Sequence, residues 1–120
     1  MWRMRLLIAY EDHHNLYSEA MEHAIHESRS HLEVEVARAS ELETEIERFD
    51  PHMVLCELPN PAHSGGRGAW VKNSYEPGEP SEVCIDGRRW ELENPMLNEL
   101  LAIIDETEEL VRTGRAPEGC

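Results

Sequence analysis

Positive charge is scarce in this chain. Lysine and arginine together number 11 against 25 aspartates and glutamates, which gives a net charge of −14, and Lys72 is the single lysine. A field of this sign repels the phosphates of nucleic acids, whereas it attracts cations and basic partner surfaces. The composition therefore argues against a DNA- or RNA-binding role.

Long apolar runs are also missing. No stretch approaches the roughly 20 residues that a helix needs to cross a membrane, and residues 1–5 lack the small-residue cleavage site of a signal peptide. We therefore expect no membrane contact. Cysteine is sparse as well: Cys56, Cys84 and Cys120 are odd in number and show no CxxC spacing. Reduced thiols in a cytoplasmic protein are the expectation.

The chain does contain enough apolar sequence for one core. A chain of 120 residues that is 40% hydrophobic is long enough for one folded domain. No internal repeat and no composition shift divides it. We expect a single domain over residues 1–114 and a flexible tail over 115–120.

Two short apolar runs lead directly into acidic residues. Residues 6–10 are followed by Glu11 and Asp12, and residues 53–56 are followed by Glu57. Continuous apolar runs of this length are typical of buried strands. Ligands of open α/β sheets bind at the carboxyl ends of the strands. If the two strands are parallel neighbours, the three carboxylates converge on one acidic pocket.

The N-terminal half alternates strands and helices. Between the two apolar runs the pattern predicts an amphipathic helix over 15–29, an alternating edge strand over 32–36 and a second helix that begins after Ser40. Ser40 and Glu43 form a capping-box pattern. Right-handed crossovers then place the first strand between the second and third, a parallel 2-1-3 order. The apolar stripe predicted for the first helix comprises Leu16, Ala20, Met21, Ala24 and Ile25.

The C-terminal half has a different pattern. A long loop is predicted after residue 58, then a strand over 69–75, and a hairpin around Asp86-Gly87, whose register puts Val83 opposite Trp90. A last helix, over about 95–113, is expected to turn Leu97, Leu100, Leu101, Ile104 and Val111 inward. The predicted fold is therefore α/β: a three-layer arrangement with a parallel 2-1-3 core, a C-terminal antiparallel meander and a C-terminal helix.

Two segments of the N-terminal half resemble a known family. Residues 5–14, which precede an amphipathic helix, and residues 51–59 are similar to the first and third strands of response-regulator receiver domains. The resemblance covers roughly residues 4–60. It implies a flavodoxin-like parallel sheet, an acidic pair at Glu11 and Asp12 that holds Mg²⁺, and Glu57 at the position of the phosphoacceptor aspartate.

The chain differs from that family at the residues that would form the phosphorylation site. Glu57 is one methylene longer than aspartate, and misplacement of a reacting atom by ~1 Å can cost about a hundredfold in rate. The family also uses a lysine that ends the fifth strand, whereas Lys72 is expected in the middle of the meander. Without that positive charge the pocket lacks an electrostatic stabiliser of phosphoryl transfer.

These departures indicate a non-enzymatic, pseudo-receiver signalling or interaction module. Such a module binds a protein partner or forms a homodimer, needs no cofactor, and has in Glu57 an imitation of a phosphorylated aspartate. The alternative is a small metal-dependent hydrolase whose ligands are Glu11, Asp12 and Glu57, since oxygen-only clusters suit hard cations such as Mg²⁺. A scaffold without any ligand is a third hypothesis.

Two further groups of residues complete the candidates. The pocket predicted at the strand ends would be extended by His13, His14 and His63, which with Cys56 or Glu57 offer ligands for a transition metal. The aromatic residues of the meander either pack in the core or form a self-association or partner interface. These are Trp70, Tyr75 and Trp90.

Overall fold

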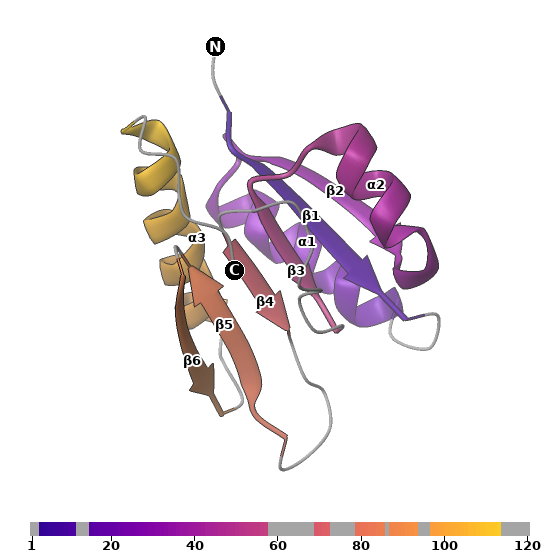
Figure 1. Ribbon diagram of the computed structural model, residues 1–120. Helices are drawn as coiled ribbons and strands as arrows, with labels where there is room; N and C mark the ends of the chain where they lie inside the picture. The colour runs from indigo at the N-terminus through magenta and orange to yellow at the C-terminus, as the bar shows by residue number, and fades with distance from the viewer. Residues whose placement is uncertain are drawn as a thin grey trace.

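The described part of the backbone forms one mixed sheet of six strands in the order β2-β1-β3-β4-β5-β6 (Figure 1). The computed structural model describes residues 3–11, 15–57, 69–72, 79–85, 87–93 and 97–113. The predicted tail, 115–120, lies outside these residues. The strands are β1 (Arg5–Tyr10), β2 (Glu33–Arg38), β3 (Met53–Cys56), β4 (Ala69–Lys72), β5 (Ser81–Ile85) and β6 (Arg88–Leu92).

The pairing of neighbouring strands changes from parallel to antiparallel once across the sheet. The pairs β1–β2, β1–β3 and β3–β4 are parallel, whereas β4–β5 and β5–β6 are antiparallel. The predicted 2-1-3 parallel core and the antiparallel meander are both confirmed. The hairpin register is confirmed as well, since Val83 pairs with Trp90 and Gly87 adopts a positive φ of 81° in the turn.

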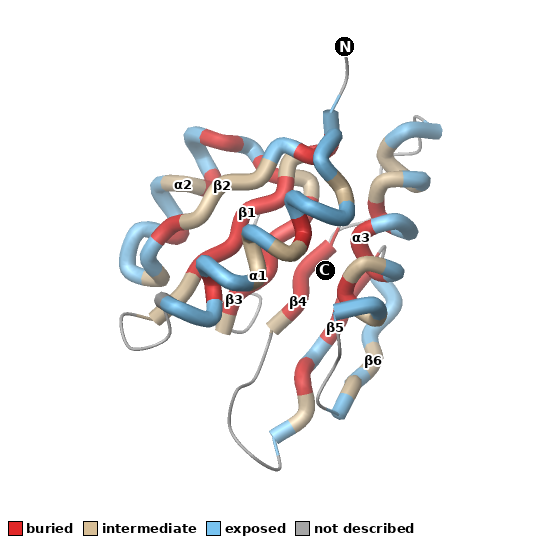
Figure 2. The backbone as a smooth tube through the Cα atoms, turned by 180° about the vertical axis from the view of Figure 1, so that it is seen from behind, coloured by how far each residue is buried: buried red, intermediate tan, exposed pale blue. Residues whose placement is uncertain are grey.

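Within the described residues, three helices cover the sheet in two layers. They are α1 (Asn15–Ser28), α2 (Leu42–Phe49) and α3 (Leu97–Arg112). Figure 2 shows α1 and α3 on the same side of the sheet, and α2 lies on the opposite side. Successive side chains of β1 point to opposite faces of the sheet. Leu6 and Ile8 join the core under α1 and α3, whereas Leu7 and Ala9 join the core under α2.

The buried face of α1 differs from the predicted stripe. Ile25 is fully buried and Ser18, two turns earlier, is buried on the same face, with Met21 half-buried between them. Leu16 is 73% exposed and Ala20 is exposed, so this part of the prediction was wrong. At about 100° per residue, Leu16 lies roughly 180° around the helix from Ile25, and the two cannot face the sheet together.

The start of α2 was also predicted wrongly. A 3₁₀ turn, η2 (Ala39–Glu41), contains Ser40 and delays the α-helix, and the N-cap residue Glu41 makes no side-chain capping bond. Helix α2 ends at Phe49. Asp50 adopts a left-handed conformation with φ 50°, and its backbone N–H donates to the Ile46 carbonyl at 3.0 Å. Leu42, Ile46 and Phe49 are buried.

The inward face of α3 comprises Leu100, Ile103, Ile104 and Thr107, all buried. The Thr107 hydroxyl donates to the Ile103 carbonyl at 2.9 Å, which satisfies this polar group inside the core. Leu97, predicted to face inward, is 38% exposed in the first turn of the helix. None of the helices in the described part of the chain is long and apolar enough to cross a membrane.

Ion pairs connect α3 to the segment between α1 and β2. The Arg29 guanidinium donates from Nε to Asp105 Oδ1 and from Nη2 to Asp105 Oδ2, both at 2.8 Å. His31 Nε2 lies 2.7 Å from Glu108 Oε2 in the same region. The hydrogen bonds from Arg29 hold the pKa of the Asp105 carboxyl below its ordinary value.

Because of this bidentate ion pair, we expect the protein to lose stability at acidic pH. Because the pKa of Asp105 is lowered on folding, its contribution is present above the ordinary aspartate pKa and is lost as the pH falls through the lowered value. We expect Asp105→Asn to reduce stability slightly at neutral pH and to flatten its decrease below about pH 4. Urea unfolding of both proteins across this range measures the effect. Parallel pH profiles would contradict it.

Candidate functional site

The carboxyl ends of β1 and β3 lie side by side. The two strands pair in parallel, with Leu6, Leu7 and Ile8 of β1 opposite Met53, Val54 and Leu55 of β3. All four residues of β3 are buried, as a strand covered on both faces requires. Both strands therefore deliver their next residues, Glu11 and Glu57, to the same edge of the sheet, as the sequence pattern predicts.

A hydrogen bond joins these two residues. The backbone N–H of Glu11 donates to Glu57 Oε2 at 3.0 Å, and both residues are half-buried. A carboxylate oxygen that accepts a backbone N–H is a charge-assisted acceptor, about twice as strong as a neutral one. The side chain of Glu57 thus fixes the first residue after β1. The bond spans 46 positions in the sequence and depends on the pairing of the two strands.

Several predicted site residues fall outside the described part of the chain. These are Asp12, His13, His14, His63 and Tyr75. Among the residues that are described, no group of three or more histidine, cysteine, aspartate and glutamate side chains is arranged to hold a metal ion. The two acidic residues that the structure does bring together are Glu11 and Glu57, and either carboxylate offers oxygen ligands to a hard cation.

Lys72 lies closer to this edge than the sequence indicates. It is the last described residue of β4 and pairs with Cys56 at the carboxyl end of β3. Its Nζ atom is 3.6 Å from Glu82 Oε2 on the neighbouring strand. The single lysine therefore stands near Glu57 in the sheet but forms an ion pair with a different glutamate. Only the parallel pairing of β3 with β4 reveals this position.

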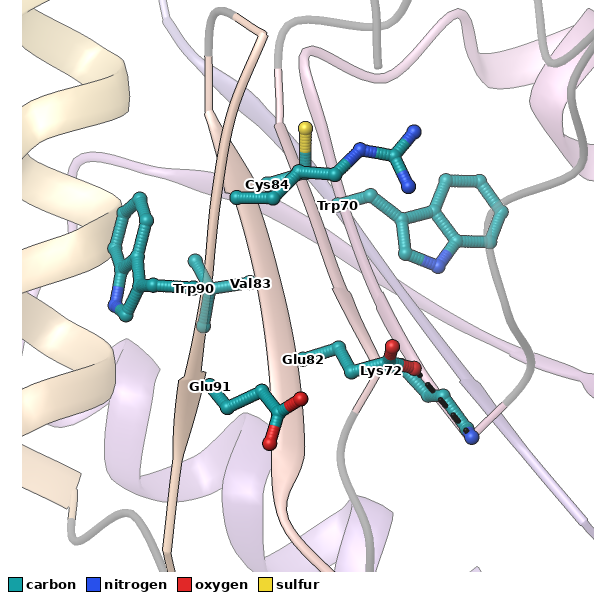
Figure 3. Close-up of a pocket in the computed structure, with 8 residues that line it drawn as sticks. Trp70, Lys72, Glu82, Val83, Cys84, Trp90 and Glu91 are labelled. Carbon is teal, nitrogen blue, oxygen red and sulfur yellow. Dashed lines mark ion pairs between the residues drawn. The ribbon is translucent and has the colours of Figure 1, made fainter.

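The two described tryptophans do not form one surface. Trp70 pairs with Cys84, and Cys84 pairs with Arg89, so these three side chains share a face of the sheet, whereas Trp90 lies on the other. In Figure 3, Trp90 points toward α3 and Trp70 points away from it. Trp70 is 2% exposed and packs in the core under α2. The predicted grouping with Trp90 is thus split between two layers.

The cysteines correct another expectation. Cys56 in β3 is buried and is not part of a disulfide, in agreement with the prediction. Cys84 in β5 is disulfide-bonded, so the expectation that all thiols are reduced was wrong. Spacing alone gave no signal of this bond, because the chain has neither a CxxC motif nor an even number of cysteines.

Comparison with known proteins gives no assignment for this arrangement. No protein family model, no curated protein and no solved structure matches the chain.

Proposed function

We propose that this protein is a receiver-like signalling or interaction module that does not carry out aspartyl phosphorylation. The observation that carries the proposal is the hydrogen bond from the Glu11 backbone to the Glu57 carboxylate, at the edge where a receiver domain has its phosphorylation site. In this protein the carboxylate of Glu57 replaces the phosphorylated aspartate of such domains.

The strand order supports a receiver-like scaffold. Strands β2-β1-β3-β4-β5 follow the 2-1-3-4-5 order of doubly wound flavodoxin-like sheets, in which ligands bind beside the point where the order reverses, between β1 and β3. Glu11 and Glu57 follow these two strands. The difference is that β5 is antiparallel to β4, so the usual fifth parallel strand and its terminal lysine have no counterpart among the described strands.

Two features argue against phosphoryl transfer at Glu57. One carboxylate oxygen accepts the Glu11 amide, which fixes the orientation of the group for binding. The Lys72 ammonium, which stands on the adjacent strand, pairs with Glu82. Stabilisation of a transferring phosphoryl group requires positive charge aimed at its oxygens. Within the described residues, the lysine that would supply it is paired elsewhere.

Phosphodonor labelling tests the proposal. The protein is incubated with acetyl phosphate and Mg²⁺, and its intact mass is measured. We expect the wild type to remain unmodified and Glu57→Asp to be labelled more, because the shorter side chain has the length of the family's phosphoacceptor. Stoichiometric labelling of the wild type at residue 57 would refute the proposal.

Metal titration separates the proposal from the hydrolase alternative. Both use Glu11 and Glu57, but only the hydrolase needs a tightly bound cation. A ligand present at 100 times its Kd raises the free energy of unfolding by about 2.7 kcal/mol. We expect millimolar Mg²⁺ or Mn²⁺ to leave the Tm unchanged. A saturable rise in Tm that Glu57→Ala abolishes would favour the metal-dependent enzyme.

The partner that we propose is another protein or a second copy of the chain. The net charge of −14 favours a basic protein surface and disfavours nucleic acid. Light scattering at increasing concentration distinguishes a monomer that awaits a partner from a homodimer.

A further inference from the structure

Strand β6 lies at one edge of the sheet, and among the described strands its one neighbour is β5. The outer side of an edge strand is a template on which a further strand can pair through backbone hydrogen bonds. In β6, Trp90 is the middle residue, with Arg89 before it and Glu91 after it. The strand therefore has opposite charges at equal distances from its centre.

The hairpin turn determines which backbone groups of β6 point to the outer edge. Ile85 and Arg88 flank the two-residue loop, so they form the hydrogen-bonded pair that closes the turn. Bonded and non-bonded pairs alternate along an antiparallel ladder, which makes Trp90 the next residue of β6 that bonds to β5. The backbone N–H and C=O groups of Arg89 and Glu91 consequently point to the outer side of the strand.

The charged side chains of β6 lie on the face of the sheet away from α3. Figure 3 shows Trp90 extending toward α3 and Glu91 extending to the other face. Arg89 shares the face of Glu91, and both residues are exposed. Glu91 lies opposite Glu82, whose carboxylate pairs with Lys72. Among the described residues no cation forms an ion pair with Glu91, so a positive charge from a partner would stabilise this carboxylate.

We propose that two copies of the chain associate edge to edge through β6, in antiparallel pairing about a two-fold axis at Trp90. In this register Arg89 of each copy lies opposite Glu91 of the other, and the two Trp90 residues lie opposite one another. The Arg89–Glu91 pairs are then the hydrogen-bonded pairs of the ladder, in agreement with the outward direction of their backbone groups. The same surface of each copy forms the interface, as two-fold symmetry requires.

Charge selects this register over the neighbouring ones. A shift that centres the axis on Arg89 places two guanidinium groups opposite one another, and a shift to Glu91 does the same with two carboxylates. Like charges directly opposite one another destabilise a pair of strands, whereas opposite charges stabilise it. The guanidinium group of Arg89 has five N–H donors, so it can bind Glu91 of the second copy in addition to contacts within its own chain.

The indole of Trp90 supports the same pairing. Trp90 is half-buried and packs against the core beneath α3. A second copy would cover more of its surface, and aromatic residues directly opposite one another stabilise paired strands. Strands β4 and β5 separate this edge from β3 and Glu57, so the inference goes beyond the proposed function. Its test and phosphodonor labelling can therefore fail independently.

Sedimentation velocity of charge-reversed variants tests the proposal. The full chain is measured at one ionic strength, because salt screens surface charges, and over a concentration range that extends to high micromolar. We expect the wild type to dimerise. Arg89→Glu and Glu91→Arg should each weaken the dimer by about tenfold or more, because both attractive pairs become repulsive. A wild type that remains monomeric, or variants that associate as tightly as the wild type, would overturn the proposal.

Mixing the two variants provides the matched control. Each copy of Arg89→Glu is complementary to a copy of Glu91→Arg in the proposed register, so an equimolar mixture is expected to form a heterodimer about as tight as the wild-type dimer. The double variant Arg89→Glu/Glu91→Arg keeps the net charge of −14 and is expected to dimerise by itself. Such recovery excludes misfolding as the cause of the loss. A mixture or a double variant that remains monomeric would contradict the Arg89–Glu91 pairing and overturn the proposal.

Discussion

Replacement of Ile25 by alanine is expected to lower the free energy of unfolding by about 2–5 kcal/mol. Ile25 is the fully buried anchor of α1 and packs in the core shared with β1, β3 and α3. Its truncation removes apolar contacts and leaves a cavity that the surrounding strands cannot fill. Since small domains have 5–15 kcal/mol of stability in total, this single change removes a large part of it. Chemical denaturation measures the difference.

Leu16→Ala in the same helix is the matched control. The substitution removes a leucine side chain that is 73% exposed, and surface substitutions of this kind usually change stability by no more than about 0.5 kcal/mol. If the apolar stripe predicted from the sequence were correct, both variants would lose a similar free energy of unfolding, because the stripe includes both residues. Comparable losses in both would show that the α1 face described by the structure is wrong.

Replacement of Glu57 by alanine is expected to detach the first residue after β1 from β3. The variant loses the carboxylate that accepts the Glu11 amide, and a hydrogen bond to a charged group contributes about 1.5–3 kcal/mol when it is well shielded from water. Because both residues are half-buried, we expect a loss of about 1–2 kcal/mol. Hydrogen exchange of the Glu11 amide should accelerate by about tenfold.

Glu57→Gln separates this contact from a general packing effect. The glutamine carbonyl has the same reach and still accepts a hydrogen bond from Glu11, although a neutral acceptor is about half as strong. We expect exchange of the Glu11 amide in this variant to lie between the rates of the wild type and Glu57→Ala. Equal exchange rates at this amide in all three proteins would remove the basis for a fixed carboxylate at the strand edge.

Local patterns predicted the elements and much of the topology. The apolar runs that became β1 and β3 are continuous because both faces of these strands are covered, and the alternation over residues 32–36 corresponds to the edge strand β2. The hairpin of β5 and β6 follows from its two-residue turn, which fixes the register. The meeting of Glu11 with Glu57 follows from parallel neighbours, whose carboxyl ends share one edge.

Other features depend on contacts between distant segments. The rotation of α1 that buries Ile25 and exposes Leu16 is set by the sheet on which the helix packs, not by its own composition. The register of β4 with β5, which separates Trp70 from Trp90, has no short turn to specify it in the sequence.

The sequence by itself therefore determined the α/β class, the 2-1-3 core and the placement of Glu11 and Glu57 at one edge of the sheet, because periodicity, turn chemistry and crossover handedness are local or general rules. Only the tertiary structure decided that Lys72 stands beside β3 while pairing with Glu82, and that Cys84 is disulfide-bonded. The position of Lys72 depends on which strands become neighbours across the sheet, and long-range pairing of this kind leaves no periodic signal in the chain.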